Sequence, residues 1–492
     1  MITDTPGPIR LRNARLVGGT EPVDIMIVDG MITNDPSGSV EELDLAGRFV
    51  TRGLWDFHVH FEQWSLARRR LDLTGTGSAA DVLAVVAERL AADPEADHDQ
   101  VLVGYGFRDG TWPDRPTRAD LDRVSGDRPV ALISNDLHSG WLNSAAFRRF
   151  GAVPSEDGVL RENAMAAVAR ELRQVPEPLL DRWVTEAAEA AAARGVVGIV
   201  DLERRFTPEH WARRVAAGTT ALRVDCGIYP PEFSEAVRRG LRTGDPVPGG
   251  AGLLTVGPFK IIADGSLNTR TAFCHDPYPE PGDPEHDHGI LLRDRDELVA
   301  MIKEAAAAGL ASTVHAIGDE ANTIALDAFQ AAGIAGRIEH AQLLHAADAE
   351  RFARLGVVAS VQPDHAVTDR DVADRHWAGR TGRAFPYAML LNAGATLILG
   401  SDAPVSPLDP WLTIAAAVHR SADDRPAWHP EQEIGLAAAL DASTGGRARP
   451  QPGDLADLVI TDVDPLAATP EQLRSMPVSG TLLGGRWTYR NL

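Results

Sequence analysis

The 492-residue chain contains 48 Lys and Arg residues against 70 Asp and Glu residues, a net charge of −22 at pH 7. This acidic balance argues against nucleic acid or an anionic membrane as a partner and favours a soluble, self-repelling surface. Cys226 and Cys274 are too few for a disulfide framework or a thiolate zinc site, so any metal would be held by histidines and carboxylates.

The first residues, MITDTPGPIRLRN, contain no basic and apolar signal region. No apolar run in the chain reaches the roughly 20 residues that a membrane span needs. We therefore expect a cytoplasmic protein whose partner is a small-molecule substrate. The oligomeric state stays open, and a homodimer is one alternative.

Short β-type segments open the chain, with Gly and Asp turn residues between them. They are IRLRNARLV, DIMIVDGMIT and EELDLAGRFV, and a similar pattern returns at the far end in LADLVITDVDP and SGTLLGGRWTYR. We predict that the two ends pair in one small β-sandwich domain, residues 1–51 with 449–492. Residues 52–448 would then form a separate body.

Apolar strand-like runs alternate with Ala-rich helical stretches within this body. Such repetition indicates a parallel sheet that is buried on both faces, so we predict an α/β fold of the (β/α)8 TIM-barrel class. Ten runs compete for eight places: FHVHF, VLVGYGF, PVALISND, GVVGIVDLE, ALRVDCGIY, FKIIADGS, STVHAIGD, RIEHAQLL, VVASVQP and TLILGSDAP. We expect the two runs before Leu137 to lie outside the barrel, in an insertion near residues 64–180.

Several of these runs end on a residue that can bind a metal. His58 and His60 lie one residue apart in LWDFHVHF, and alternate residues of a strand face the same way. Three later runs end similarly, with His315 in STVHAIGD, His340 in RIEHAQ and Asp402 in ILGSDAP. Each histidine alone could be a core residue, and Asp402 could cap a helix. Because the carboxyl ends of barrel strands converge on one face, the joint pattern predicts a metal site.

Lys260 lies inside the apolar strand FKIIADGS. A buried ammonium group is costly unless it is paired or chemically altered. The alternatives are a side chain that reaches the rim of the barrel or one that pairs with Asp264.

At this point the sequence resembles the amidohydrolase superfamily, in the branch typified by YtcJ-like proteins and N-substituted formamide deformylases. The resemblance covers nearly the whole chain and rests on DFHVHF, NDLHSGWLNSAA, FKIIADGSLNTRTA, VHAIGD, IEHAQL, GSDAPVSPLDPW and PGDLADLVITDVDP. It implies a (β/α)8 barrel with a small β-sandwich and hydrolysis at a metal centre. Carried over by motif, the ligands are His58, His60 and Asp402 for one metal, His315 and His340 for a second, and a carboxylated Lys260 as the bridge.

The implied chemistry gives each ligand type a task. Two divalent ions lower the pKa of a bound water and polarise the substrate carbonyl. Asp402 would accept the proton of the water and return it to the leaving nitrogen. Imidazoles and carboxylates suit zinc, although iron or manganese would fit. We expect two Zn2+ ions, or one metal if Lys260 is unmodified.

The resemblance also places four residues near the substrate. His138, Trp141 and Asn143 of HSGWLNS would lie over the pocket, and His138 could donate to the developing oxyanion. Asn143 could instead cap the helix that follows it. Arg270 would border the substrate, although the preceding Asn-Thr pair departs from the Gly-Ser that the family more often shows.

Three classes of function follow. The leading one is a metal-dependent hydrolase of a C–N bond in an amide, formamide or carbamate-like small molecule. The second is a mononuclear deaminase, or an esterase or lactonase, on the same scaffold. Deaminases of this superfamily usually carry a glutamate soon after the strand-five histidine, whereas HAIGDE offers Asp319 and Glu320 at another offset. The third is a non-catalytic scaffold, against which the complete ligand set argues.

Overall fold

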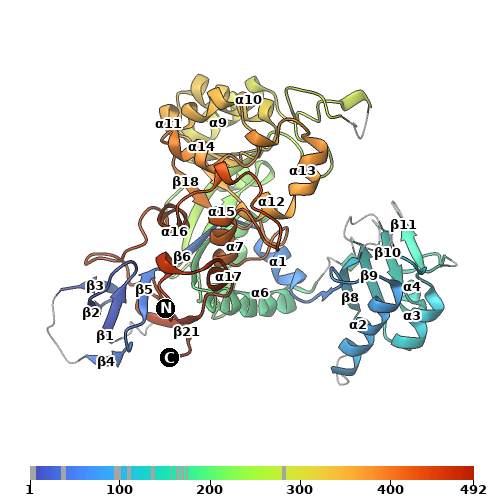
Figure 1. The fold of residues 1–492 in the computed structure, drawn as a ribbon, viewed down its shortest axis with the longest axis horizontal. Helices are drawn as coiled ribbons and strands as arrows, with labels where there is room; N and C mark the ends of the chain where they lie inside the picture. The colour runs from blue at the N-terminus through green and yellow to red at the C-terminus, as the bar shows by residue number, and fades with distance from the viewer. Residues whose placement is uncertain are drawn as a thin grey trace. The chain divides into compact units, whose positions relative to one another are not determined.

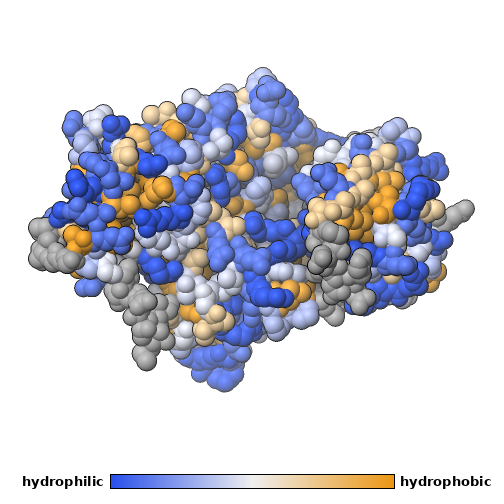
Figure 2. Space-filling view, turned by 90° about the horizontal axis from the view of Figure 1, so that it is seen from below, coloured by the Kyte–Doolittle hydropathy of each residue, from blue (hydrophilic) through white to orange (hydrophobic). Residues whose placement is uncertain are grey.

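A computed structural model describes most of the chain as two compact units. The described residues are 7–34, 40–92, 101–107, 112–134, 139–155, 157–161, 165, 168, 171–172, 175–279 and 284–492. One unit contains the residues up to Trp64 together with Val184–Leu492, and the other is Ser65–Trp183. Within these residues, every helix is too short or too polar to cross a membrane. Hydrophilic residues cover much of the face shown in Figure 2.

The larger unit contains a parallel barrel. Its strands, in sheet order, are β6 (Leu54–Val59), β12 (Val196–Asp201), β13 (Arg223–Ile228), β14 (Leu254–Ile262), β15 (Ser312–Ala316), β16 (Arg337–His340), β17 (Val358–Val361) and β18 (Leu397–Leu399). All neighbours in this order pair in parallel, and a parallel bridge from Val59 to Ala403 joins the last strand to the first. The predicted fold class is confirmed.

Strand β12 shows why the barrel strands form continuous apolar runs. All six of its residues, VVGIVD, are buried, because helices cover the outside of a barrel and side chains fill its interior. Gly198 lies against the Trp55 side chain of β6, and a Cβ added there would approach that side chain to 2.3 Å. A larger residue would therefore push the two strands apart.

The larger unit also contains helices, most of which follow barrel strands in the chain and lie around them in Figure 1. They are α1 (Phe61–Ala67), α6 (Glu177–Ala192), α7 (Thr207–Ala216), α8 (Phe233–Arg238), α9 (Arg295–Ala307), α10 (Asp319–Ala332), α11 (Ala346–Leu355), α12 (Pro363–Thr368), α13 (Arg370–His376), α14 (Tyr387–Asn392), α15 (Pro410–His419), α16 (Leu436–Ser443) and α17 (Pro470–Arg474). The start of α9 shows a local cause. Asp294 and Glu297 each accept the backbone N–H of the other, a capping box that satisfies two end donors.

Both ends of the chain contribute to a second sheet in this unit. Its strands are β1 (Ile9–Leu16), β2 (Pro22–Val28), β3 (Met31–Thr33), β4 (Glu41–Asp44), β5 (Phe49–Arg52), β19 (Leu458–Thr461), β20 (Val478–Leu483) and β21 (Arg486–Arg490). Antiparallel pairing of β5 with β19 joins the two ends, which is why blue and dark red strands belong to one sheet in Figure 1. Leu11, Val50, Ile460 and Leu482 are fully buried in its core.

The smaller unit is built on a sheet in the order β11-β10-β9-β8-β7. Its elements are β7 (Leu71–Asp72), α2 (Ala79–Ala92), β8 (Leu102–Phe107), α3 (Arg118–Ser125), β9 (Val130–Ser134), β10 (Ser139–Leu142), α4 (Ser144–Phe150) and β11 (Val159–Arg161). Leu132 and Ile133 belong to two different core clusters, because successive strand residues face opposite sides of a sheet. The runs VLVGYGF and PVALISND form β8 and β9, which belong to this sheet and not to the barrel sheet.

Candidate metal centre

The barrel brings the predicted metal ligands to the carboxyl ends of its strands. His58 and His340 lie at the ends of β6 and β16, and His315 lies near the end of β15. Lys260 is the third residue from the end of β14. His60 directly follows β6, and Asp402 lies three residues after the end of β18. All six belong to the larger unit. This is the face on which the active sites of (β/α)8 barrels are built.

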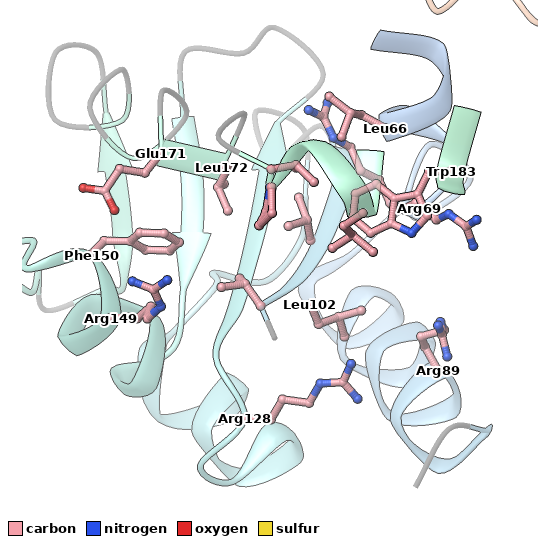
Figure 3. Close-up of a pocket in the computed structure, with 16 residues that line it drawn as sticks. Leu66, Arg69, Arg89, Leu102, Arg128, Arg149, Phe150, Glu171, Leu172 and Trp183 are labelled. Atoms are coloured by element: carbon pink, nitrogen blue, oxygen red, sulfur yellow. The ribbon is translucent and has the colours of Figure 1, made fainter. Parts of the chain in front are cut away.

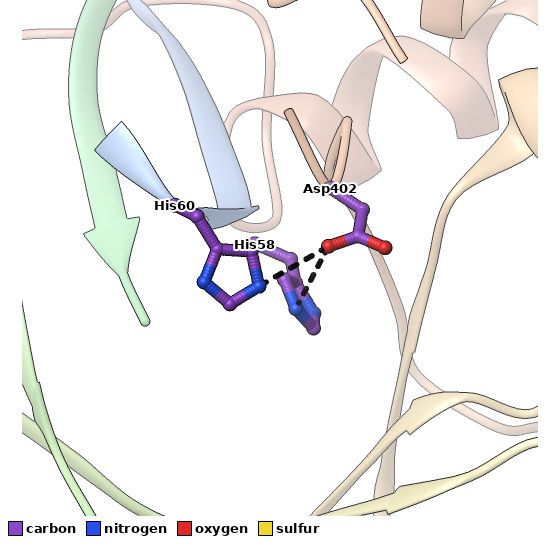
Figure 4. A group of neighbouring side chains, drawn as sticks. All are labelled: His58, His60 and Asp402. Atoms are coloured by element: carbon purple, nitrogen blue, oxygen red, sulfur yellow. Dashed lines mark ion pairs between the residues drawn. The ribbon is translucent and has the colours of Figure 1, made fainter. Parts of the chain in front are cut away.

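His58, His60 and Asp402 form one tight group, drawn in Figure 4. The Nε2 atoms of His58 and His60 lie 3.4 Å and 3.5 Å from the same oxygen, Oδ1 of Asp402. One ligand atom from each residue lies within 4.8 Å of the other two. Burial raises the pKa of Asp402, but the two histidines outweigh it and hold that pKa well below its usual value. The group therefore presents an ionised carboxylate between two imidazoles.

His315 and His340 lie next to this group. Their ring centroids are 4.5 Å apart, and the ring of His340 is 4.9 Å from that of His58. Burial, followed by the charge of Lys260, lowers the pKa of His315 to about 3, and burial also lowers that of His340 well below its usual value. Nε2 of His315 is 3.0 Å from the carbonyl oxygen of Gly265. A neutral imidazole that donates from Nε2 keeps a lone pair on Nδ1, as a metal ligand needs.

Lys260 is buried beside these residues, with 2% of its surface exposed. Its Nζ atom makes no hydrogen bond to any residue that the structure describes. Burial lowers the pKa of the Lys260 amine to about 8, although the carboxylates of Glu339 and Asp402 act in the opposite direction. A position at the rim of the barrel does not match this burial. A pair with Asp264 does not match either, because the Asp264 carboxylate accepts the backbone N–H groups of Phe273 and Gly318.

Glu339 belongs to the site, although the sequence analysis did not single it out. Its Oε2 atom lies 2.8 Å from Nδ1 of His58, and its Oε1 atom accepts the hydroxyl of Thr313 at 2.5 Å. The side chain is fully buried. A carboxylate on Nδ1 holds the proton there and leaves Nε2 of His58 for a metal. The sequence feature that could have indicated Glu339 is a charged residue inside the apolar run RIEHAQLL.

Glu339→Gln tests this positioning. The amide can hold either tautomer of His58, so we expect the apparent metal affinity to fall about 10- to 100-fold while the protein stays folded. Glu350→Gln, in α11, is the control and should leave the affinity unchanged. Competition with a chromogenic chelator measures both variants, and an unchanged affinity in Glu339→Gln would remove the positioning role.

His365 also approaches the site and was missed in the sequence. It lies in α12, directly after β17, and its Nε2 atom is 3.7 Å from Oδ2 of Asp402. Its Nδ1 atom is 3.1 Å from Nε2 of Gln342. The run VVASVQP ends without a metal-type ligand, so the strand-end pattern did not reach the histidine that follows in QPDHA.

The backbone is strained at two of the ligands. His340 and Asp402 have φ angles of 79° and 57°, and Ala341 has 42°. Non-glycine residues rarely adopt this left-handed region, and it costs on the order of 1–3 kcal/mol each. The surrounding barrel holds these residues there, which is typical of functional sites.

The predicted substrate-binding residues are divided between the two units. His138 lies outside the described residues. Trp141 and Asn143 belong to the smaller unit and are fully buried. The indole N–H of Trp141 donates to the carbonyl of Thr117. Arg270 lies in the loop after β14, with a φ of 57°.

The Asn143 side chain is used completely inside its own unit. Oδ1 accepts the backbone N–H groups of Ala146 and Val130, and Nδ2 donates to Oγ of Ser125 and to the carbonyl of Arg128. Asn143 is therefore the helix N-cap that the sequence allowed as the alternative. The substrate-binding role needs correction, because no donor or acceptor of this side chain is left for a substrate.

The donor set fits a divalent metal. Nδ1 of His340 and Nζ of Lys260 are buried and lack a hydrogen-bond partner among the described residues. Leaving such atoms unsatisfied costs free energy that a bound cation or a modified lysine would recover. Neutral imidazoles with one carboxylate are ligands for zinc, iron or manganese.

The chain is similar to known proteins over nearly its whole length. The family model described as "Amidohydrolase family" matches residues 41–489. The putative amidohydrolase YtcJ of Bacillus subtilis is 28% identical, over 92% of this chain and 91% of its own, and the N-substituted formamide deformylase of Arthrobacter pascens is 25% identical, over 91% and 90%. The crystal structure of an uncharacterized metal-dependent hydrolase from Pyrococcus furiosus has a TM-score of 0.75 and 25% identity, over 93% of this chain and 100% of that one.

Proposed function

Because the chain belongs to the amidohydrolase family, we propose that it is a metal-dependent hydrolase that cleaves a C–N bond in an amide, formamide or carbamate-like small molecule. The observation that carries this proposal is the shared approach of His58 and His60 to Oδ1 of Asp402. The name of the Arthrobacter relative, an N-substituted formamide deformylase, supports the choice of bond.

The residues divide the work of holding the metal. His58 and His60 would hold one divalent cation with Asp402, and His315 and His340 would hold a second. Lys260, carboxylated on Nζ, would lie between them. When bound, the cations supply an acidified water and a polarised substrate carbonyl. Zinc is the metal we propose.

Asp402 is suited to move the proton. Its Oδ1 atom faces His58 and His60, whereas Oδ2 faces His365 at 3.7 Å. The lowered pKa keeps the carboxylate ionised, which is the state that accepts a proton from water. The same group then returns the proton to the leaving nitrogen, because a free amine leaves far more readily than its anion.

A mononuclear site is the second candidate. Among the described residues, the group whose ligand atoms all lie within 4.8 Å contains three residues, His58, His60 and Asp402. Three protein ligands are enough for one catalytic metal. With Lys260 unmodified, this site would suit a deaminase, an esterase or a lactonase.

The test combines metal content with a substrate screen. We expect the purified protein to contain one to two equivalents of transition metal, and the zinc-loaded enzyme to hydrolyse a member of a panel of N-formyl, N-acyl and carbamate compounds. His58→Ala and His315→Ala should lose metal and hydrolysis together. His429→Ala, which changes a histidine that pairs with Glu431 and is not a predicted ligand, should lose neither. Full metal content in the His58→Ala/His315→Ala double variant would contradict the ligand assignment, and activity on esters or exocyclic amines alone would favour the second candidate.

A further inference from the structure

The smaller unit contains a cavity of about 550 Å3 with an unusual charge. Figure 3 shows that it lies by β8, the end of α4 and the start of α6. Among the described residues that line it are one glutamate, Glu171, and five arginines, which are Arg69, Arg70, Arg89, Arg128 and Arg149. This clustering of arginines contrasts with the net charge of −22 of the whole chain and favours an anionic ligand.

Arg128 is the most deeply placed of these arginines. It is 8% exposed, and its buried Nε atom has no hydrogen-bond partner among the residues that the structure describes. In the described part of the chain, no carboxylate lies within ion-pair distance of its guanidinium group. Burying a charge without a partner is costly, so an Arg128 kept in this position points to an anion that is supplied from outside.

The turn that carries Arg128 is held in place. The Arg128 carbonyl accepts Nδ2 of Asn143 at 2.8 Å, and its N–H donates to the carbonyl of Ser125 at 3.2 Å. The hydrogen bond from Asn143 therefore holds the backbone of this turn in place. A fixed turn lowers the entropy cost of placing the guanidinium group against a ligand.

The rest of the wall is largely apolar. Leu102 is buried and lies above Arg128 in the view of Figure 3, and Phe150 and Leu172 lie on the side of α4. The guanidinium carbon of Arg69 lies 5.5 Å from the ring centroid of Trp183, a cation–π contact. An apolar body would fill this space and an anionic head would reach Arg128.

We propose that this cavity binds a small carboxylate with an apolar alkyl or aryl body. The carboxylate would accept two parallel N–H bonds from Arg128, the geometry that guanidinium groups favour. All lining residues belong to the smaller unit, and none is one of the six predicted metal ligands. The two sites share no residue, so this proposal does not depend on the proposed hydrolysis.

Hexanoate is the probe, and hexanol, of the same chain length, is the neutral control. With isothermal titration calorimetry on the full chain, we expect hexanoate to bind saturably at one site and hexanol to bind at least 10-fold more weakly. Arg128→Met should weaken hexanoate binding at least 10-fold, and Arg148→Gln, which removes an exposed arginine outside the lining, should not. The His58→Ala/His315→Ala double variant, which should lack the metal, should bind hexanoate as the wild type does, and this separates the cavity from the metal centre.

Thermal unfolding gives a second measurement that does not need a binding curve. Without ligand, Arg128→Met should melt at or above the temperature of the wild type, because an unpaired buried charge is removed. Hexanoate should raise the melting temperature of the wild type and not that of Arg128→Met. The proposal is overturned if hexanoate binds both proteins equally, if it fails to bind the wild type, if inorganic phosphate alone binds, or if Arg128→Met melts lower and gains the same shift.

Discussion

Asp402→Asn is expected to keep most of the bound metal and to lose about 10²- to 10⁴-fold in turnover, the range that a general base contributes. The oxygen of an amide can still coordinate weakly at the position that Oδ1 occupies near His58 and His60. An amide cannot accept the proton from water or return it to the leaving nitrogen. Metal analysis and single-turnover kinetics on the same preparation separate the two effects.

Asp369→Asn is the matched control for this prediction. Asp369 lies 3.7 Å from Nδ1 of His365, so it is a neighbouring carboxylate on the far side of the same histidine. We expect this variant to retain most of its turnover. If Asp402→Asn instead kept near wild-type turnover, another group would be the base, and Glu203, which is buried after β12, would be the first to examine.

The barrel and its ligands could be predicted because they follow strand periodicity. A buried parallel strand leaves an apolar run, and a His-X-His pair at its end places two imidazoles on one side. His58 and His60 show this directly, since both approach one oxygen of Asp402. The family resemblance added the order of the ligands along the chain.

Glu339 could not be found by the same periodicity. Neighbouring residues of a regular strand face opposite sides, so a metal-binding His340 predicts that Glu339 points away. The φ of 79° at His340 breaks this alternation, and both residues contact or approach His58. Because non-glycine residues seldom adopt a left-handed φ, the amino-acid sequence around His340 does not indicate this backbone conformation.

Trp141 and Asn143 illustrate a different limit. A shared motif indicates that a residue type is needed at a position, but it does not show whether the need is for binding or for folding. In this chain the amide of Asn143 satisfies the start of α4 and the turn at Arg128. The burial of both side chains depends on the packing of β8–β10, which pattern alone did not place.

Lys260 presents the question of one metal or two, and the composition of the chain sharpens it. Of the 48 Lys and Arg residues, two are lysines, Lys260 and Lys303. A chain that uses arginine almost everywhere keeps a lysine inside β14, where a guanidinium group could not lose its proton. Burial lowers the pKa of the Lys260 amine to about 8, so a usable fraction is neutral near pH 7 and can react with carbon dioxide.

We therefore expect apo-protein reconstituted with zinc to need bicarbonate for full activity and then to bind close to two metal ions. Lys260→Ala should bind about one and be partly rescued by short carboxylic acids that fill the vacated space. With 13C-labelled bicarbonate, NMR should show one carbamate signal that is lost in Lys260→Ala and kept in Lys303→Ala, which removes the exposed lysine of α9. Wild-type metal content and activity in Lys260→Ala, without added acid, would rule out the bridge and leave the mononuclear site. The reason is that alanine has no atom that could bind two cations in place of a carboxylated lysine.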